Sequence, residues 1–230
     1  MCASDLAVLL KPSELAPDYV LATPGVADRL VPLIAQAVAD MFGADPKAGP
    51  FGRIINEGHF NRLAALVADP ENGRVALGGQ HDRSVKYLAP TILTGTAPDA
   101  PIMSAEIFGP VLPVVTVESA GAAIAHINAG DKPLALYVFS EDKAVRRRFL
   151  KETSSGAITF NLPMAHLAVA ELPFGGVGES GMGAYHGRRS LEIFSHEKSV
   201  VSKPLRPDTL ALVYPPFSRQ KSGLLRKLLG

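Results

Sequence analysis

Hydrophobic and polar residues follow two alternating periods along most of the chain. Stretches with apolar residues at helical spacing are separated by short apolar runs rich in Val, Ile and Leu, which are typical of buried strands. This order predicts an α/β fold, with a mostly parallel, twisted sheet flanked by helices. We expect helices over 26–42, 56–68, 119–129, 141–152 and 185–194, and strands over 74–77, 87–93, 111–117, 134–139 and 156–160.

Capping residues and prolines indicate where some of the predicted elements begin and end. Thr23 before Pro24 predicts the start of the first helix and Gly43 its end, while Pro32 predicts a kink between them. From Pro204 onward, proline and basic residues replace the alternation, so 204–230 is predicted to be a tail. Its last twelve residues hold four cations and a leucine cluster, which would suit an amphipathic helix on an anionic membrane. We favour a solvated tail or a dimer contact, because so short a helix is marginal by itself.

Composition and charge exclude several classes of protein. The 230 residues are 47% hydrophobic and 20% charged, which is ordinary globular composition. The formal charge of +1 argues against a dedicated nucleic-acid binder, which needs surplus Lys and Arg. The single cysteine, Cys2, has no partner for an internal disulfide, so we expect a reducing, cytoplasmic setting. We expect neither a membrane span nor a signal peptide, since the apolar runs are short and the first residues lack a basic segment.

The glycine-rich stretch Gly176-Val177-Gly178-Glu179-Ser180-Gly181 matches the pattern G-x-G-x-x-G of a dinucleotide-binding turn. That interpretation requires a strand directly before it, and Pro173 is a poor end for a central strand. Glu179 would also place negative charge beside a pyrophosphate. We favour a tight loop in which glycine lets the backbone approach a neighbour or ligand closely.

Other catalytic chemistries find little support in the sequence. The histidines show neither i, i+4 pairs nor accompanying cysteines, so no metal site is predicted, and each is expected to be solvated or hydrogen-bonded. Cys2 lies near a chain end that usually frays and lacks a positioned base, so we do not expect it to be a nucleophile. The six histidines are His59, His81, His126, His166, His186 and His196.

The segment Glu106-Ile107-Phe108-Gly109-Pro110 joins an acidic residue, an aromatic ring and a Gly-Pro turn to a predicted buried strand. At such an entrance Glu106 could accept hydrogen bonds from ligand hydroxyls, and Phe108 could form an apolar wall. By chemistry alone, a loop carboxylate and a core phenylalanine are the simpler interpretation.

Two long motifs resemble the aldehyde dehydrogenase superfamily, in particular its class 3 and coniferyl-aldehyde dehydrogenases. They are Ala105-Glu106-Ile107-Phe108-Gly109-Pro110-Val111, and Leu172-Pro173-Phe174-Gly175-Gly176-Val177-Gly178 with Ser180-Gly181-Met182-Gly183-Ala184-Tyr185-His186-Gly187. The resemblance extends from about 15 to 204. It implies oxidation of an aldehyde, for example an aromatic one such as coniferyl aldehyde, to the carboxylic acid. Hydride passes to NAD or NADP through a cysteine thiohemiacetal and a thioester.

The resemblance also implies roles for particular residues. Glu106 would bind the hydroxyls of the nicotinamide ribose, and Phe108 would pack against the nicotinamide side of the cofactor. Phe174 would line the aldehyde pocket, and Asn161 and His166 would lie on the loop that closes it. A strand over 198–201 resembles the oligomerisation arm of the family, which implies a homo-oligomer or a hetero-oligomer with intact relatives.

The start of the chain departs from the family. Residues 1–14 resemble the strand and loop of the cofactor-binding domain in which Lys11 and Glu14 would contact the adenosine ribose or its phosphate. Residues from Leu15 to Leu21 then resemble the segment that follows the catalytic cysteine, which would fall about where Glu14 stands. The phosphate-binding turn, the general-base glutamate and the nucleophilic cysteine are missing between them.

These departures imply a truncated and internally deleted family member. Residues 1–14 would be a remnant of the cofactor-binding domain, 15–203 a catalytic-domain-like region with the arm at about 196–203, and 204–230 the tail. We expect no catalytic residue of the family in this chain, weak or absent NAD(P) binding, and no activity of the chain alone. Complementation by another polypeptide, a non-catalytic scaffold that pairs with intact relatives, and a fragment without a role remain alternatives.

Overall fold

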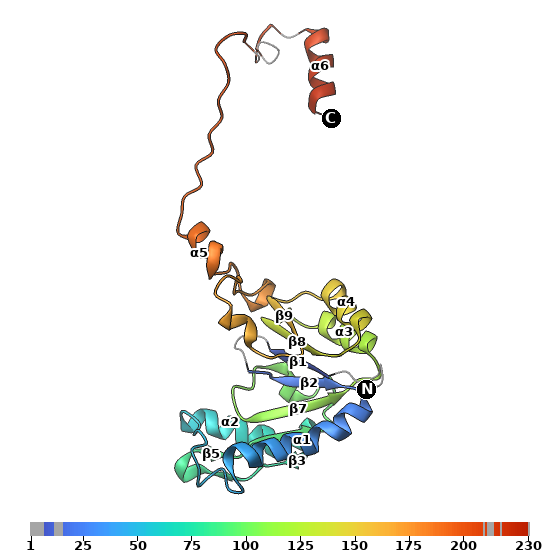
Figure 1. Ribbon diagram of the computed structural model, residues 1–230, viewed down its shortest axis with the longest axis vertical. Helices are drawn as coiled ribbons and strands as arrows, with labels where there is room; N and C mark the ends of the chain where they lie inside the picture. The colour runs from blue at the N-terminus through green and yellow to red at the C-terminus, as the bar shows by residue number, and fades with distance from the viewer. Residues whose placement is uncertain (1–6, 12–15, 209, 211–213, 217, 230) are drawn as a thin grey trace. The chain divides into compact units, whose positions relative to one another are not determined.

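The computed structural model describes the chain except residues 1–6, 12–15, 209, 211–213, 217 and 230. It divides into two compact units, Met1–Ile193 and Phe194–Gly230 (Figure 1). The first unit holds the sheet and five α-helices, and the second holds one α-helix among its described residues.

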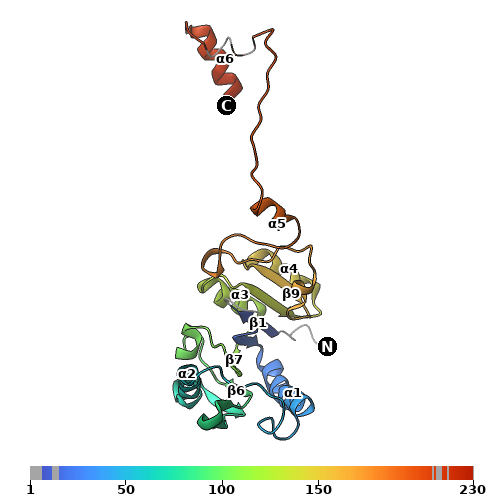
Figure 2. The same cartoon turned by 90° about the vertical axis from the view of Figure 1, so that its left-hand side faces the viewer.

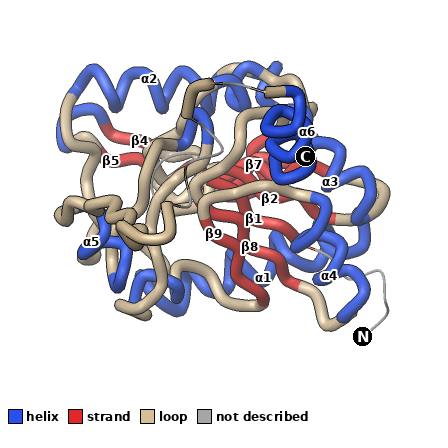
Figure 3. The backbone as a smooth tube through the Cα atoms, turned by 90° about the horizontal axis from the view of Figure 1, so that it is seen from above, coloured by secondary structure: helices blue, strands red, loops and turns tan. Residues whose placement is uncertain are grey.

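The first unit is built on a seven-stranded sheet in the order β3-β6-β7-β2-β1-β8-β9. Figure 3 shows β7, β2 and β1 side by side in the middle of this sheet. Three neighbouring pairs are parallel, namely β2 with β7, β6 with β7 and β8 with β9, and the other three are antiparallel. The predicted α/β fold is confirmed, but the sheet is mixed rather than mostly parallel. For one antiparallel pair the reason is the short connection, because a parallel neighbour needs a crossover of a dozen or more residues and only seven residues separate β1 from β2. The strands are β1 (Ala7–Lys11), β2 (Tyr19–Ala22), β3 (Arg74–Leu77), β6 (Thr91–Thr94), β7 (Val111–Thr116), β8 (Ala135–Phe139) and β9 (Ala157–Phe160).

The helices begin and end close to the predicted positions. Thr23 and Gly43 flank the first helix, which continues through Pro32. Three later helices start at Asn56, Ser119 and Asp142, whose side chains accept backbone N–H groups of the first turn. The α-helices are α1 (Pro24–Phe42), α2 (Glu57–Ala68), α3 (Ala120–Ala129), α4 (Lys143–Glu152), α5 (Gly187–Ile193) and α6 (Arg219–Leu229). The 3-10 helices are η1 (Pro70–Asn72), η2 (Arg83–Val85), η3 (Pro101–Ser104), η4 (Ala165–Ala168) and η5 (Gly178–Ser180).

Helices cover both faces of the sheet, with α2 and α3 on one side and α1 on the other (Figure 2). Successive residues of a strand point to opposite faces, so each strand contributes to two cores. Thus Leu21 of β2 packs in the cluster of α3 and α4, whereas its neighbour Val20 packs in the cluster of α1. A third cluster joins Leu63 of α2 to Leu93 and Val111.

Two predicted strands differ in the structure. The run 87–93 is divided, because Pro90 has no N–H for a ladder; β5 (Tyr87–Leu88) pairs with β4 (His81–Asp82), and the rest joins the large sheet as β6. The segment 198–201 pairs with no strand in the described chain. Its side chains Val200 and Val201 are 78% and 95% exposed, as an arm without a partner strand would be. Pairing of this arm between subunits stays a prediction.

Residues Ala7–Lys11, the described part of the segment predicted to be a cofactor-domain remnant, form strand β1 inside the sheet. Strand β1 is hydrogen-bonded between β2 and β8, so in this chain it completes the same layer as the residues that follow it. Its origin in a cofactor-binding domain stays a prediction. None of the described helices combines the length and the apolar character needed to cross a membrane.

Candidate active-site region

The turn that carries Glu106 and Phe108 joins η3 to β7 and is held from α2. The Arg62 guanidinium donates to two carbonyl oxygens, that of Glu106 at 3.3 Å and that of Ile107. The His59 ring Nε2 contacts the carbonyl oxygen of Phe108 at 2.5 Å. From the opposite side, the buried Asp18 carboxylate accepts the Ile107 N–H at 3.2 Å. The turn is therefore fixed at three successive residues.

Phe108 adopts an unusual backbone conformation for a bulky residue. Its φ is +47°, in the left-handed region that glycine and asparagine normally occupy. Such a residue costs roughly 1–3 kcal/mol and persists only where its surroundings enforce it. The next residue must be small, because a Cβ on Gly109 would lie 2.5 Å from the Leu63 Cδ1 atom. The strained turn is thus supported by close packing as well as hydrogen bonds.

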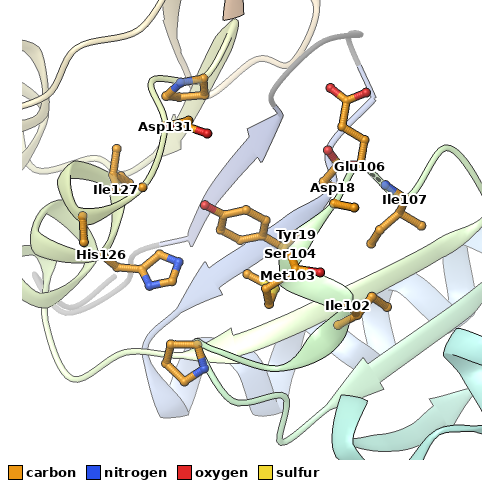
Figure 4. A pocket seen from close by; sticks show the side chains of 15 residues that line it. Asp18, Tyr19, Ile102, Met103, Ser104, Glu106, Ile107, His126, Ile127 and Asp131 are labelled. Carbon is orange, nitrogen blue, oxygen red and sulfur yellow. Dashed lines mark hydrogen bonds between the residues drawn. The ribbon is translucent and has the colours of Figure 1, made fainter. Parts of the chain in front are cut away.

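Glu106 lines a cavity of about 460 Å³ at the amino-terminal end of β2. Figure 4 shows the Tyr19 ring between His126 of α3 and the Glu106–Ile107 turn. Burial, and secondarily the charge of Asp18, raises the pKa of Tyr19 to about 12, so the phenol stays neutral near pH 7. Burial also lowers the pKa of His126. With Asp18 and Asp131, three carboxylates face this cavity, which suits hydroxyl or cationic ligand groups.

Phe108 faces a different hollow, of about 390 Å³, formed mainly by residues 53–56 and His59. Its side chain is 43% exposed there. The structure therefore places Glu106 and Phe108, two of the four predicted cofactor residues, on one turn but beside two separate hollows.

The predicted aldehyde-pocket residues Phe174 and His166 lie together. Their rings stack with centroids 6.0 Å apart and planes at 29°. Phe174 also forms a two-way backbone pair with Tyr185, at 2.8 and 2.9 Å, and its ring meets the Tyr185 ring edge-on at 5.5 Å. The His186 ring lies 6.2 Å from that of Phe174. An aromatic wall of four rings results.

His166 is the least expected of these residues. Its side chain is only 8% exposed, and among the residues that the structure describes neither ring nitrogen has a hydrogen-bond partner. Burial lowers the pKa of His166, because the charged imidazolium loses more hydration than the neutral ring. The sequence predicted a solvated or hydrogen-bonded histidine, and this prediction is wrong for His166.

Asn161 is engaged with the backbone. Its side-chain oxygen accepts the Ser140 N–H at 2.8 Å, and its amide donates to the Ser140 carbonyl at 3.3 Å. These bonds tie the loop after β9 to the end of β8. A role of Asn161 in closing an aldehyde pocket stays a prediction.

The remaining predicted residues lie at the start of the chain. Lys11 ends β1 and pairs in register with Ala135 of β8. Glu14 and Cys2 lie outside the described residues, so their predicted roles are not tested.

The glycine-rich stretch forms a tight loop. A Cβ on Gly175 would lie 2.2 Å from the Gly183 carbonyl oxygen, and one on Gly176 would lie 2.0 Å from that of Ser180. The segment contains the short helix η5, and the following α-helix begins only at Gly187. The close-approach interpretation is confirmed. In the described part of the chain, no group of three or more His, Cys, Asp and Glu residues is arranged to hold a metal ion.

Sequence reasoning missed His59, Arg62, Asp18 and Tyr19. One signal was available for the first two, because residues three apart lie on the same face of a helix. No local pattern could have shown that this face meets the turn at 106–108, some 45 residues further along the chain. Asp18 precedes and Tyr19 begins β2, a strand of four residues that is too short to stand out by its periodicity.

Comparison with known proteins agrees with the fold and the motifs. The family model of the aldehyde dehydrogenase family matches residues 14–200. The substrate-bound AldH of Staphylococcus aureus superposes with a TM-score of 0.81 at 38% identity, over 95% of this chain and 47% of that one. The chain belongs to the aldehyde dehydrogenase family.

The curated relatives that the chain matches include class 3 members of this family. The rat dimeric NADP-preferring aldehyde dehydrogenase is 47% identical over 204 residues, which are 88% of this chain and 44% of that protein. The bovine protein of the same name is 45% identical, over 87% of this chain and 84% of that protein. Human aldehyde dehydrogenase family 3 member B1 is 46% identical, over 92% of this chain and 45% of that protein. The chain thus spans less than half the length of the rat and human relatives.

Proposed function

We propose that this chain forms the carboxyl-terminal part of an NAD(P)-dependent aldehyde dehydrogenase that oxidises an aldehyde, aromatic ones included, to the acid. The observation that carries the proposal is the turn at Glu106–Phe108, which directs a carboxylate into a cavity and holds an aromatic ring beside a second hollow. The aromatic wall at Phe174 and His166 would face the aldehyde. The names of class 3 relatives include "NADP-preferring", and a betaine aldehyde dehydrogenase of 26% identity and TM-score 0.67 was solved with NAD+.

The residues around Glu106 fit one part of such a cofactor. NAD(P), when bound, accepts a hydride from the substrate. Carboxylates accept hydrogen bonds from ribose hydroxyls, so Glu106 suits the ribose. The described residues that line its cavity include neither Lys nor Arg, and a pyrophosphate favours cations or a helix amino terminus. We therefore propose that this chain holds the ribose end and that NAD(P) binding to the chain alone is weak.

We further propose that the chain by itself does not oxidise aldehydes. The family resemblance requires a cysteine nucleophile at about Glu14, and the only cysteine of the sequence is Cys2. A glutamate there would be a weak nucleophile toward a carbonyl without an activating base. Loss of the nucleophile alone removes several powers of ten in rate in enzymes that form a covalent intermediate.

A steady-state assay tests this proposal. The purified chain, NAD+ or NADP+, and a panel of aromatic and aliphatic aldehydes should give no formation of NAD(P)H above the blank. Turnover that disappears in Glu106→Ala and persists in Glu118→Ala, a change at an exposed carboxylate outside the region, would show that the chain is catalytically complete.

The segment 196–203 supports a second proposal, that copies of this chain pair through it. Two adjacent valines, Val200 and Val201, are 78% and 95% exposed in a stretch that pairs with no strand of the described residues. Several relatives carry "dimeric" in their names. A β arm added to another subunit would cover these side chains and satisfy the backbone.

A further inference from the structure

The strongest unassigned arrangement is the contact of α2 with the turn at 106–108. Three successive carbonyl oxygens, those of Glu106, Ile107 and Phe108, bind side chains of one helix. In an extended strand successive carbonyls point to opposite sides, so this convergence requires a bent backbone. The positive φ of Phe108 supplies the bend.

The hydrogen-bonding partners define the state of His59. A carbonyl oxygen can only accept, so the His59 Nε2 atom must donate to Phe108. A guanidinium can only donate, so the His59 Nδ1 atom must accept from the Arg62 Nη2 atom, 3.3 Å away. His59 is therefore a neutral ring with its hydrogen on Nε2, and it links Arg62 to the third carbonyl.

Leu63 completes the contact. It follows Arg62, is fully buried, and packs against the position where Gly109 leaves no room for a side chain. Residues 59, 62 and 63 have the i, i+3, i+4 spacing of one helix face. A single face of α2 thus holds the turn by two polar side chains and one apolar one.

We propose that His59 and Arg62 are positioning residues that fix the turn of Glu106–Phe108. By holding its carbonyls, they determine that the Glu106 carboxylate faces the cavity at β2 and that the Phe108 ring faces the second hollow. The consequence for NAD(P) rests on the proposed function. The positioning itself does not, and it can be measured without a ligand.

Matched variants separate positioning from general stability. Arg62→Met and His59→Leu remove the polar contacts. His59→Gln retains one donor and one acceptor, and Arg62→Lys retains the charge but cannot span two carbonyls and a ring. Arg83→Met is the control, because it removes an exposed ion pair of Arg83 with Glu57 of α2 and does not touch the turn.

Two measurements report on the turn. Hydrogen exchange at two backbone amides reports on local opening of the turn. The Ile107 amide donates to Asp18, and the Thr91 amide donates to the Pro110 carbonyl at 2.7 Å. The ¹⁹F signal of 4-fluorophenylalanine at position 108 reports on ring orientation. In Arg62→Met and His59→Leu we expect exchange about tenfold faster at these amides and a shifted or broadened ¹⁹F signal. Exchange of core amides of β8 should be unchanged, and His59→Gln and Arg83→Met should resemble the unmodified chain.

Unchanged exchange and an unchanged ¹⁹F signal in folded Arg62→Met and His59→Leu would overturn the proposal. If either variant fails to fold, the same measurements on Arg62→Lys and His59→Gln decide. Arg62→Lys should loosen the turn and His59→Gln should not. A titration with NADPH adds a separate outcome. If Arg62→Met and His59→Leu bind NADPH more weakly by the same factor as Glu106→Gln, the positioning also serves the cofactor. If no form of the chain binds NADPH, only the proposed cofactor role is contradicted.

Discussion

His166 shows how one side chain links stability to pH. Its ring is stacked on Phe174 and lies 6.2 Å from the Tyr137 ring, and the described side chains and backbone around it offer its nitrogens no hydrogen-bond partner. A neutral imidazole still buries one N–H donor there, and an unsatisfied buried polar group costs about 1–3 kcal/mol. The protonated ring would cost more.

We therefore expect acid to weaken the first unit through His166. Burial lowers the pKa of His166 in the folded state, so below its ordinary value the unfolded chain takes up a proton that the folded chain excludes. The free energy of unfolding should fall as the pH falls from about 7.5 to about 5.5. His166→Phe keeps an aromatic ring, removes the contribution of His166 to this dependence and leaves that of His126. It should raise stability by about 1 kcal/mol at neutral pH.

Urea unfolding at both pH values measures the effect. His196→Phe, at an exposed position of the second unit, is the control and should leave the pH dependence unchanged. Equal pH dependence in His166→Phe and the unmodified chain would contradict the argument.

At the scale of elements, side-chain hydrogen bonds join helices to one another, and the hydrophobic pattern of a single helix or strand does not predict these bonds. Asn72 is fully buried at the end of η1. Its amide donates to the Leu66 carbonyl of α2 at 2.9 Å, and its side-chain oxygen accepts the Ile102 N–H of η3 at 2.7 Å. One side chain thus joins α2 to the segment that leads into the Glu106 turn.

We expect Asn72→Ala to lower the free energy of unfolding by about 2–4 kcal/mol, because it leaves a buried N–H and a buried carbonyl without partners. Asn128→Ala is a matched control, since it removes one exposed bond to the Glu152 carbonyl and should cost less than about 1 kcal/mol. Chemical denaturation of both variants compares the two losses. Similar losses would mean that Asn72 does not carry this connection.

The same scale shows where prediction from the sequence succeeds. Helix α2 was predicted to within a residue, because Asn56 caps its start and apolar residues recur at its period. The mixed sheet was not, because strand direction depends on which strands meet. Residue periodicity specifies the faces of a strand but not its neighbours.

At the scale of the whole molecule, the proposed pairing of subunits gives a direct test. Charge on the exposed arm should prevent a second chain from covering it, since burying an unpaired carboxylate is costly. Val200→Asp with Val201→Asp should therefore convert a dimer into a monomer in light scattering, without a change in the unfolding midpoint of the first unit. Leu205→Asp is the control, at a position that is 89% exposed beyond the arm. A monomer in the unmodified chain would contradict the proposal.

By itself, the sequence determined the α/β class, most helix ends and the family motifs, because caps, periodicity and the runs at 105–111 and 172–187 are local. The motifs also named Glu106, Phe108, Phe174 and His166 as candidate site residues, whose roles stay predictions. Only the tertiary structure decided the sheet order, the insertion of β1 between β2 and β8, and the contact of His59 and Arg62 with the turn. These features join residues far apart in the chain, and their energies depend on burial and on partners that appear only when the elements pack together.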